Sequence, residues 1–562
     1  MKKFTFSLLL LCFNMSLFAQ IDCPTPSAVH WKERNNIYAP IDNAGHPFSY
    51  TSNNDNAIFV NTVNNPTEAA TIFVTGLWIG GIDPGGNLKE TVVTYDEDTG
   101  FRAGPVQLLN DFPDSTVCNN WDKIWTVSRE EIETHLADLA DNGFIDAPII
   151  SIFSWPANGN TDFESIEGFP LPEGSFGLAP FFDKNGDGNY EPEEGDFPLP
   201  IGLSENALPQ EVTYCLFNDA RLPTASSSFD PLQFQIGQTT YVYDCEANNA
   251  LNNTVFVTYQ MTNMAAESID SLHIGMFVDF DLGCYYDDYI GSDTIRNAFF
   301  AYNEDNIDGI SMGVCDGTPT FGENPPVQAI TFLNKPLSYF TYHSTSGQSM
   351  GSDPNSPIEY YRYLTGSWRD GSPLEFGGDG YQEGTTPTAH AFPDDPNNPD
   401  GWSMNTTNLN ALDRRAVGSS KVGILQPGQS FSIDMAFTYV REQSASNLEN
   451  VTAMYDHIDQ VQAAYDNGFF GDCMPTATTN LAAVDYNFEI YPNPASDMLT
   501  IKFPNFTLKT IRLMDVTGQI ILEKSGQFQY ETSLDLSQFS KGVYFLQMEN
   551  GTQQFYEKIS VQ

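Results

Sequence analysis

Residues 183–194 are the stretch whose residue types and spacing most clearly indicate a chemistry. Oxygen-bearing side chains occupy positions 1, 3 and 5, glycine occupies position 6 and glutamate position 12, which is the pattern of a calcium loop. A hard cation prefers six or seven oxygen ligands, and the glycine permits the sharp turn that brings them together. The predicted ligands are the side chains of Asp183, Asn185, Asp187 and Glu194, the backbone carbonyl of Asn189, and Glu191 through a water molecule.

The residues that flank this stretch disfavour the helices of an EF-hand. Pro180 precedes it closely, and Gly195 and Pro198 follow it. We therefore expect an isolated, structural calcium loop that does not open and close as a sensor does. The alternative is a solvated Asp/Gly turn with no ion.

A second acidic group contains Asp279 and Asp281, followed by Asp287, Asp288 and Asp293. If residues 278–282 form a strand, Asp279 and Asp281 point to the same face, and two like charges so close raise one pKa or require a cation. Three interpretations are open: a second calcium site, which we favour slightly, a carboxylate pair for glycoside hydrolysis, or a solvated acidic edge. Three aromatic residues nearby could stack on sugars or belong to the core: Tyr285, Tyr286 and Tyr289.

Other catalytic motifs are weak or missing from the sequence. Residues 347–351 read G-x-S-x-G, but Pro354 and Pro357 follow too soon for the helix that a nucleophile elbow needs, so we interpret the match as chance. The sequence has no HExxH, no phosphate-binding GxxxxGK[ST] and no dinucleotide-binding fingerprint.

The charge of the chain excludes one class of partner. Its 562 residues include 73 acidic and 24 basic side chains, a net charge of −49. Such a surface repels nucleic acid and anionic membranes and attracts divalent cations.

The first 19 residues have the pattern of a secretory signal peptide: Lys2 and Lys3, a short apolar run, and Ala19 as the cleavage point. Seven cysteines remain after Cys12 is removed with it. In an exported protein disulfides are plausible, and we expect Cys215 to pair with Cys245 and Cys284 with Cys315. An odd number leaves at least one thiol free or paired elsewhere.

The body divides by composition. Residues 20–210 are rich in Gly, Asn, Asp and Pro, residues 211–472 are dense in strand patterns and end in a helix, and residues 473–486 form a small polar linker. Two helices are predicted from capping boxes, one opening at Ser128 with Glu131 and one at Ser446 with Glu449.

Residues 487–562 alternate apolar and polar side chains over short runs separated by Gly and Asn turns, which predicts six or seven strands in a small sandwich. Five motifs occur in order along this segment: residues 491–494, 515–519, 534–537 and 541–545, and Lys558. Together they resemble a type A sorting domain of the type IX secretion system. The resemblance implies that these residues are the sorting signal: Tyr491, Pro492, Asn493, Pro494, Gly518, Gly542, Tyr544 and Lys558.

That resemblance also implies recognition by the outer-membrane translocon, followed by release or attachment to surface lipopolysaccharide. The body resembles, diffusely, large secreted proteins of no established activity. We expect a mainly β, multi-domain chain with a sandwich or jelly-roll-like body and a C-terminal immunoglobulin-like sandwich. The expected function is that of a calcium-stabilised surface protein acting by binding or structure, as in adhesion or a surface layer. The alternative is an exported glycoside hydrolase or lectin.

Overall fold

The computed structural model of the chain describes residues 23–49, 59–63, 65–95, 100–106, 115–172, 177–220, 229–245, 249–309, 315–344, 350–407, 409–469, 489–514, 520–549 and 554–561. The chain forms two compact units, Met1–Met474 and Pro475–Gln562. The predicted signal peptide at residues 1–19 and the linker at 473–486 lie outside the described residues. No helix in the described ranges combines the length and apolar character that a membrane crossing requires.

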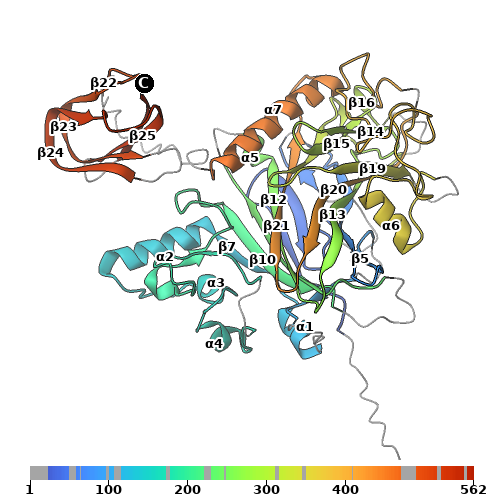
Figure 1. Cartoon of the computed structure of the whole chain (residues 1–562), viewed down its shortest axis with the longest axis horizontal. Helices are drawn as coiled ribbons and strands as arrows, with labels where there is room; N and C mark the ends of the chain where they lie inside the picture. The colour runs from blue at the N-terminus through green and yellow to red at the C-terminus, as the bar shows by residue number, and fades with distance from the viewer. Residues whose placement is uncertain are drawn as a thin grey trace, which may run out of the picture. The chain divides into compact units, whose positions relative to one another are not determined.

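The first unit contains an antiparallel sheet of nine strands (Figure 1). In spatial order they are β14 (Asp288–Asp293), β15 (Ala298–Asn303), β18 (Val327–Phe332), β21 (Ser430–Val440), β12 (Thr254–Asn263), β11 (Phe234–Val242), β10 (Glu211–Asn218) and β6 (Arg102–Ala103), with β7 (Trp125–Ser128) also on β10.

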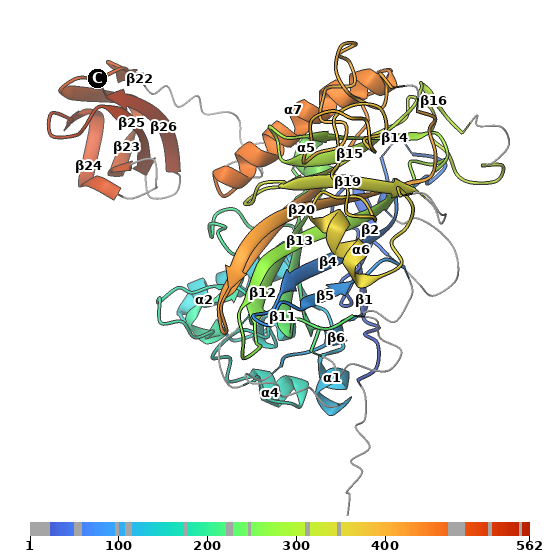
Figure 2. The ribbon, with the colours of Figure 1, turned by 45° about the vertical axis from the view of Figure 1, so that its right-hand side comes forward.

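A second antiparallel sheet has five strands, whose order can be followed in Figure 2. They are β19 (Tyr339–Ser344), β20 (Arg414–Leu425), β13 (Ile269–Phe280), β4 (Ile72–Ile82) and β5 (Leu88–Val92). Strands from residues 20–210 and from residues 211–472 share both large sheets, so the two predicted regions form one compact unit.

The main core lies between these two sheets. Along β12, Val255, Val257 and Tyr259 enter this core, whereas Phe256 belongs to a separate cluster on the other face. This alternation follows from the two-residue period of a strand. Phe299 of β15 and Phe340 of β19 connect the sheets, with ring centroids 5.3 Å apart. The body is therefore a β-sandwich, as the strand patterns predict.

Helices and short hairpins cover the sandwich. The hairpins are β1 (Val29–Lys32) with β2 (Ile37–Asp42) and β3 (Val60–Asn61), β8 (Phe181–Phe182) with β9 (Phe197–Pro198), and β16 (Ile307–Asp308) with β17 (Gly322–Glu323). The helices are α1 (Ser115–Trp121), α2 (Arg129–Asn142), α3 (Ile150–Phe153), α4 (Phe163–Glu167), the 3-10 turn η1 (Pro192–Glu194), α5 (Asn249–Asn252), α6 (Pro357–Leu364) and α7 (Asn447–Asp466).

Both predicted capping boxes are confirmed. Ser128 and Glu131 exchange side-chain and backbone hydrogen bonds at the start of α2, and Ser446 and Glu449 do so at the start of α7. Each box satisfies amide groups that a helix start leaves without intrahelical partners. The buried stripe of α7 packs on the nine-stranded sheet through a cluster that includes Val451, Met454, Ile458, Phe300 and Val440.

The C-terminal unit has its own core, which includes Leu499, Ile511, Leu546 and Ile559. Its strands are β22 (Glu489–Tyr491), β23 (Met498–Met514), β24 (Ile520–Asp535), β25 (Gly542–Glu549) and β26 (Gln554–Val561), joined in one antiparallel set. The expectation of six or seven strands is wrong for the described residues. Predicted pairs of short strands are continuous in β23 and β24, which bulge where their register shifts.

The disulfide predictions are half right. Cys284 and Cys315 are bonded, and so are Cys23 and Cys118. The predicted Cys215–Cys245 bond is absent: Cys215 is a free, buried thiol in β10, and Cys245 is disulfide-bonded elsewhere. Cys215 packs in the apolar core between the sheets, where a cysteine behaves as a small hydrophobic residue.

Candidate cation and carboxylate sites

The loop at residues 183–194 follows β8 and ends in η1. Gly186 and Gly188 both have positive φ, at 77° and 83°, and their amides donate to the Asp183 carboxylate over 2.6 and 2.8 Å. The first predicted ligand therefore anchors a tight turn, and glycine allows the left-handed conformation that the turn requires.

Three further carboxylates of this loop converge on one amide group. Nδ2 of Asn185 lies 3.3 Å from Asp187 Oδ2, 3.2 Å from Glu191 Oε2 and 3.2 Å from Glu194 Oε2. Desolvation raises the pKa of Glu191, and the charges of Glu194 and Asp187 add to that rise. The side chains of five predicted ligands thus lie on one exposed turn. Asn189 donates its backbone amide to Asp187 Oδ1 over 2.8 Å.

Asp196 is a residue of this turn that the loop pattern does not include. It is fully buried, and its two carboxylate oxygens accept the amides of Lys184 and Glu191, each over 2.9 Å. It therefore ties the first and last parts of the loop together. Burial raises its pKa, while those two hydrogen bonds act in the opposite direction. The calcium-loop pattern ends at Glu194, so it gives no signal for this residue.

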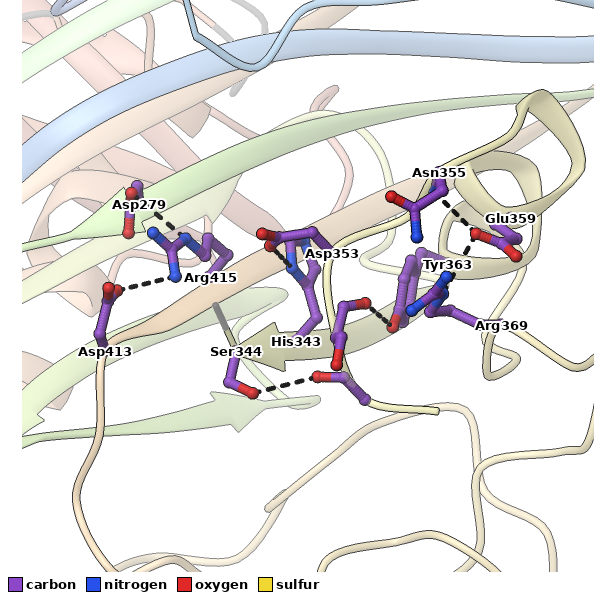
Figure 3. A network of polar contacts seen from close by, with 12 residues as sticks. Asp279, His343, Ser344, Asp353, Asn355, Glu359, Tyr363, Arg369, Asp413 and Arg415 are labelled. Carbon is purple, nitrogen blue, oxygen red and sulfur yellow. Dashed lines mark hydrogen bonds and ion pairs between the residues drawn. The ribbon is translucent and has the colours of Figure 1, made fainter. Parts of the chain in front are cut away.

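The second site lies where β13 ends beside β20. Asp279 faces Arg415 across the two strands, and Tyr95 lies between them: its hydroxyl donates to Asp279 Oδ2 over 2.7 Å and accepts from Arg415 Nε over 2.7 Å. Figure 3 shows Arg415 between the carboxylates of Asp279 and Asp413. Nη1 of Arg415 is 3.0 Å from Asp413 Oδ1, an ion-pair contact without hydrogen-bond geometry.

Asp279, Asp281 and Asp413 each offer a carboxylate oxygen within 4.8 Å of the others. The sequence places Asp279 and Asp281 on one strand face, but β13 ends at Phe280, so Asp281 reaches the group from the turn that follows. Asp279 is only 3% exposed, and its Oδ1 has no hydrogen-bond partner in the described part of the chain. Burial raises its pKa to about 7, against the opposing charge of Arg415. Burial also raises the pKa of Asp281 and Asp413, so the group favours protons or a cation.

A His–Asp pair lies next to this group. His343 pairs with Arg415 in the register of β19 and β20, and its Nδ1 is 2.9 Å from Asp353 Oδ1 (Figure 3). The imidazole is 2% exposed, and its Nε2 has no hydrogen-bond partner among the residues described. Burial lowers the pKa of His343, which favours the neutral ring.

The tyrosines near the acidic group differ in exposure. Tyr286 is exposed, Tyr285 is half-buried against it, and Tyr289 is half-buried against Tyr302 and the core. The sequence does not predict that Asp279 contacts Tyr95, Asp413 or Arg415, because all three are far from Asp279 along the chain. The pairing of β13 with β20 brings Asp279 and Arg415 together.

The predicted sorting residues that the structure describes lie in or next to β22, β25 and β26. Oδ1 of Asn493 accepts the backbone amide of Ser560 over 2.9 Å, and Nζ of Lys502 lies 5.1 Å from the centroid of the Tyr491 ring. Gly542 opens β25, and the Tyr544 hydroxyl donates to the Ser540 carbonyl over 2.7 Å. The backbone of Lys558 pairs with Phe545. Gly518 lies outside the described residues, as does most of the G-x-S-x-G stretch.

Residues 489–562 match the family model of the secretion system C-terminal sorting domain. The chain is therefore exported across the envelope by type IX secretion, to the cell surface or the extracellular space. No curated protein matches the chain.

Two solved structures show weak likeness. A polysaccharide lyase is 10% identical with a TM-score of 0.18, over 69% of this chain and 40% of its own length. A GalM/aldose epimerase homologue from C. elegans is 9% identical with a TM-score of 0.22, over 74% and 99%. The chain thus spans well under half of the lyase. Scores this low carry no argument about function.

Proposed function

We propose that this type IX secretion cargo is a cation-stabilised β-protein of the cell surface or extracellular space that acts by binding or as structure, in adhesion or a surface layer. The sorting domain supports the destination. The two disulfides within the described ranges and a large double-sheet core support a rigid body suited to an oxidising exterior.

The convergence of Asp187, Glu191 and Glu194 around the Asn185 side chain is the observation that carries this proposal. Like charges so close repel one another, and a calcium ion removes the repulsion while using the oxygen donors that it prefers. Asp183 and Asp196 fix the backbone of the turn that carries these carboxylates.

The Asp279 group is proposed as a second calcium site. Its three carboxylates and the Arg415 guanidinium sum to two negative charges when all are ionised, which matches one divalent ion. The oxygen Asp279 Oδ1, buried without a partner, is a ligand atom that such an ion would satisfy.

Calorimetric titration of the mature protein with calcium tests both sites. We expect heat of binding and a rise in melting temperature. Asp187→Asn should weaken the loop site, whereas the exposed Asp316→Asn serves as a matched control. Absence of both heat and a melting shift would overturn the proposal.

The same acidic group favours one alternative, an exported carbohydrate-active protein. A carboxyl with a pKa of about 7 beside further carboxylates has the acid–base character that glycoside hydrolysis uses. A glycan array and a polysaccharide-degradation screen separate the two functions. Polysaccharide hydrolysis that is abolished by Asp281→Asn and retained by Asp316→Asn would support the alternative. A negative result in both screens would support the first proposal.

A further inference from the structure

Three buried aspartates gather where the turn after β13 meets the end of β16. Asp287 directly precedes β14, Asp288 begins it, and Asp308 is the last residue of β16, a strand that lies near β14 in both views (Figure 1, Figure 2). Asp287 is 3% exposed, and Asp288 and Asp308 are each 2% exposed. A carboxylate oxygen of Asp287 lies within 4.8 Å of one of Asp308. Carboxylates are rarely buried unless a partner offsets their charge.

Asp308 is held in place by the backbone around it. Its Oδ1 accepts the amide of Cys284 over 2.9 Å, and its Oδ2 accepts the amide of Phe321. Gly283 leaves room for this carboxylate, because a β-carbon there would lie 2.0 Å from Asp308 Oδ2. Burial raises the pKa of Asp308 to about 7, while the two amides and the charge of Arg441 oppose that rise. Amide donors stabilise an ionised carboxylate, so the local backbone accommodates a charge.

Asp287 and Asp288 each use one carboxylate oxygen and leave the other without a partner. Oδ2 of Asp287 accepts the amide of Gly309 over 3.0 Å, and Oδ2 of Asp288 accepts that of Leu282 over 2.9 Å. The Oδ1 atom of each is buried and has no hydrogen-bond partner in the described part of the chain. Burial raises the pKa of Asp288, and the charges of Asp287 and Asp308 add to the rise. Buried oxygens without partners are costly, and a bound ion is one way to satisfy them.

The described residues supply no direct counter-charge to this cluster. None of the three aspartates is within ion-pair distance of a lysine, arginine or histidine in the described ranges. The Asp279 group differs, because Arg415 contacts both Asp279 and Asp413. The repulsion among the three ionised carboxylates therefore remains, and a divalent cation would offset most of their charge.

The donor atoms available at the cluster are oxygens. Sγ of Cys284 lies within 4.8 Å of carboxylate oxygens of Asp287 and Asp308, but it is bonded to Cys315 and is not a thiolate ligand. Oxygen donors favour calcium, whereas zinc prefers nitrogen and sulfur. Two calcium–oxygen bonds of about 2.4 Å span at most about 4.8 Å, so one calcium ion can contact both carboxylates.

We propose that Asp287 and Asp308 bind a buried calcium ion beside the Cys284–Cys315 disulfide, with Asp288 adding negative charge next to the ion. This site is separate from the loop at residues 183–194 and from the Asp279 group, and it depends on neither. The ion joins the start of β14 to the end of β16. Both segments lie within the loop that the disulfide closes.

Equilibrium dialysis with calcium-45 tests the proposal on the mature full chain after a chelator has removed bound metal. The background is the double variant Asp187→Asn/Asp281→Asn, in which each of the two cation sites proposed above loses a charged ligand. Adding Asp287→Asn to this background should lower the bound calcium by about one ion per chain. Asparagine keeps an oxygen that can accept the Gly309 amide, so the substitution removes the charge and retains that contact. Adding Asp316→Asn, an exposed residue next to Cys315, should leave the bound calcium unchanged.

Melting curves show that each variant is folded and give a second measurement. Without calcium, Asp287→Asn should be at least as stable as the wild type, because it removes a buried charge. With calcium, its melting temperature should rise less than that of the wild type.

Equal calcium binding in the background with and without Asp287→Asn would overturn the inference. A loss of equal size with Asp316→Asn would also overturn it, since that loss would reflect net charge alone. If the wild type and the background bind the same amount of calcium, and Asp287→Asn still removes one ion, the inference stands although the two other cation sites fail.

Discussion

Nε of Arg415 lies 3.3 Å from Oδ2 of Asp279, which it faces across the paired strands β20 and β13. Asp279 is buried, and Asp413 contacts the same guanidinium. A buried charge is tolerated only where a partner offsets its lost hydration. Arg415 is therefore the residue that allows three neighbouring carboxylates to coexist when no cation is bound.

Replacing Arg415 with Gln should lower the free energy of unfolding at pH 7 by about 3 kcal/mol, because it leaves buried carboxylates without a counter-charge. Urea denaturation measures the change. The loss should be smaller at pH 5, where Asp279 is protonated in the folded protein. Arg512→Gln, at the solvent-exposed ion pair with Glu523, is the matched control and should have little effect. Equal losses at both arginines would contradict this account.

Glu90 provides a test of how stability depends on pH that involves neither the loop at residues 183–194 nor the Asp279 group. It is fully buried in β5, both carboxylate oxygens lack partners in the described part of the chain, and burial raises its pKa to about 9. Because the folded state holds the proton and the unfolded state loses it near pH 4.5, this group favours folding at low pH and opposes it as pH rises toward 9.

Glu90→Gln keeps the neutral shape and cannot ionise. Relative to this variant, the wild type should lose stability by about 1.4 kcal/mol per pH unit between roughly pH 5 and 9. Denaturation curves across that range measure the difference. Parallel pH profiles for the two proteins would mean that Glu90 is not held neutral in the fold.

Calcium should stabilise the body through the loop at residues 183–194. An ion that binds only the folded state adds about 2.7 kcal/mol when present at one hundred times its dissociation constant. Asp187→Asn should remove most of the gain in melting temperature, because it withdraws one charged ligand from the turn. Asp316→Asn should retain it. A calcium gain of equal size in both variants would place the ion elsewhere.

Local patterns predict local structure well in this chain. The capping boxes at Ser128 and Ser446 depend on residues three apart, and both form as predicted. The loop beginning at Asp183 is also local, and its side chains lie on one turn as the spacing requires. Asp196 lies just beyond the pattern, so the pattern alone does not find it.

Contacts that depend on sheet pairing are not visible in the sequence. The Asp279 group includes Tyr95, Asp413 and Arg415. The pairing of β13 with β20 places Arg415 opposite Asp279, and Arg415 in turn contacts Tyr95. The wrong disulfide prediction for Cys215 also arises from sheet pairing. The spacing of Cys215 and Cys245 suits a loop closed by a disulfide. However, Cys215 lies in β10, which pairs with β11, and its thiol is buried in the core between the sheets. In the C-terminal unit, turn-like residues within β23 and β24 form bulges and do not end the strands, so the sequence predicts more strands than are present.

The two described disulfides should stabilise the body unequally. Cys23–Cys118 closes a loop with a sequence separation of 95, and Cys284–Cys315 one of 31. In the chain-entropy account, the longer loop contributes about 1 kcal/mol more. We therefore expect the Cys23→Ala/Cys118→Ala double variant to unfold at lower urea concentration than Cys284→Ala/Cys315→Ala. Cys215→Ala should leave the disulfide map unchanged, and a new bond pattern in it would contradict the free thiol.

Removal of the sorting domain should separate folding from export. The first unit, Met1–Met474, has cores of its own, so a chain truncated before residue 487 should fold with an unchanged disulfide map. It should accumulate in the periplasm, because the translocon no longer finds its signal. Cell fractionation followed by immunoblotting locates it.

A point substitution in the sorting domain, Asn493→Ala, tests the same requirement more specifically. It removes the contact between the start of the domain and Ser560 and should reduce delivery of the protein to the cell surface. Asn206→Ala in the body is the matched control. Surface delivery of the truncated chain at the wild-type level would show that residues 489–562 are not required for export.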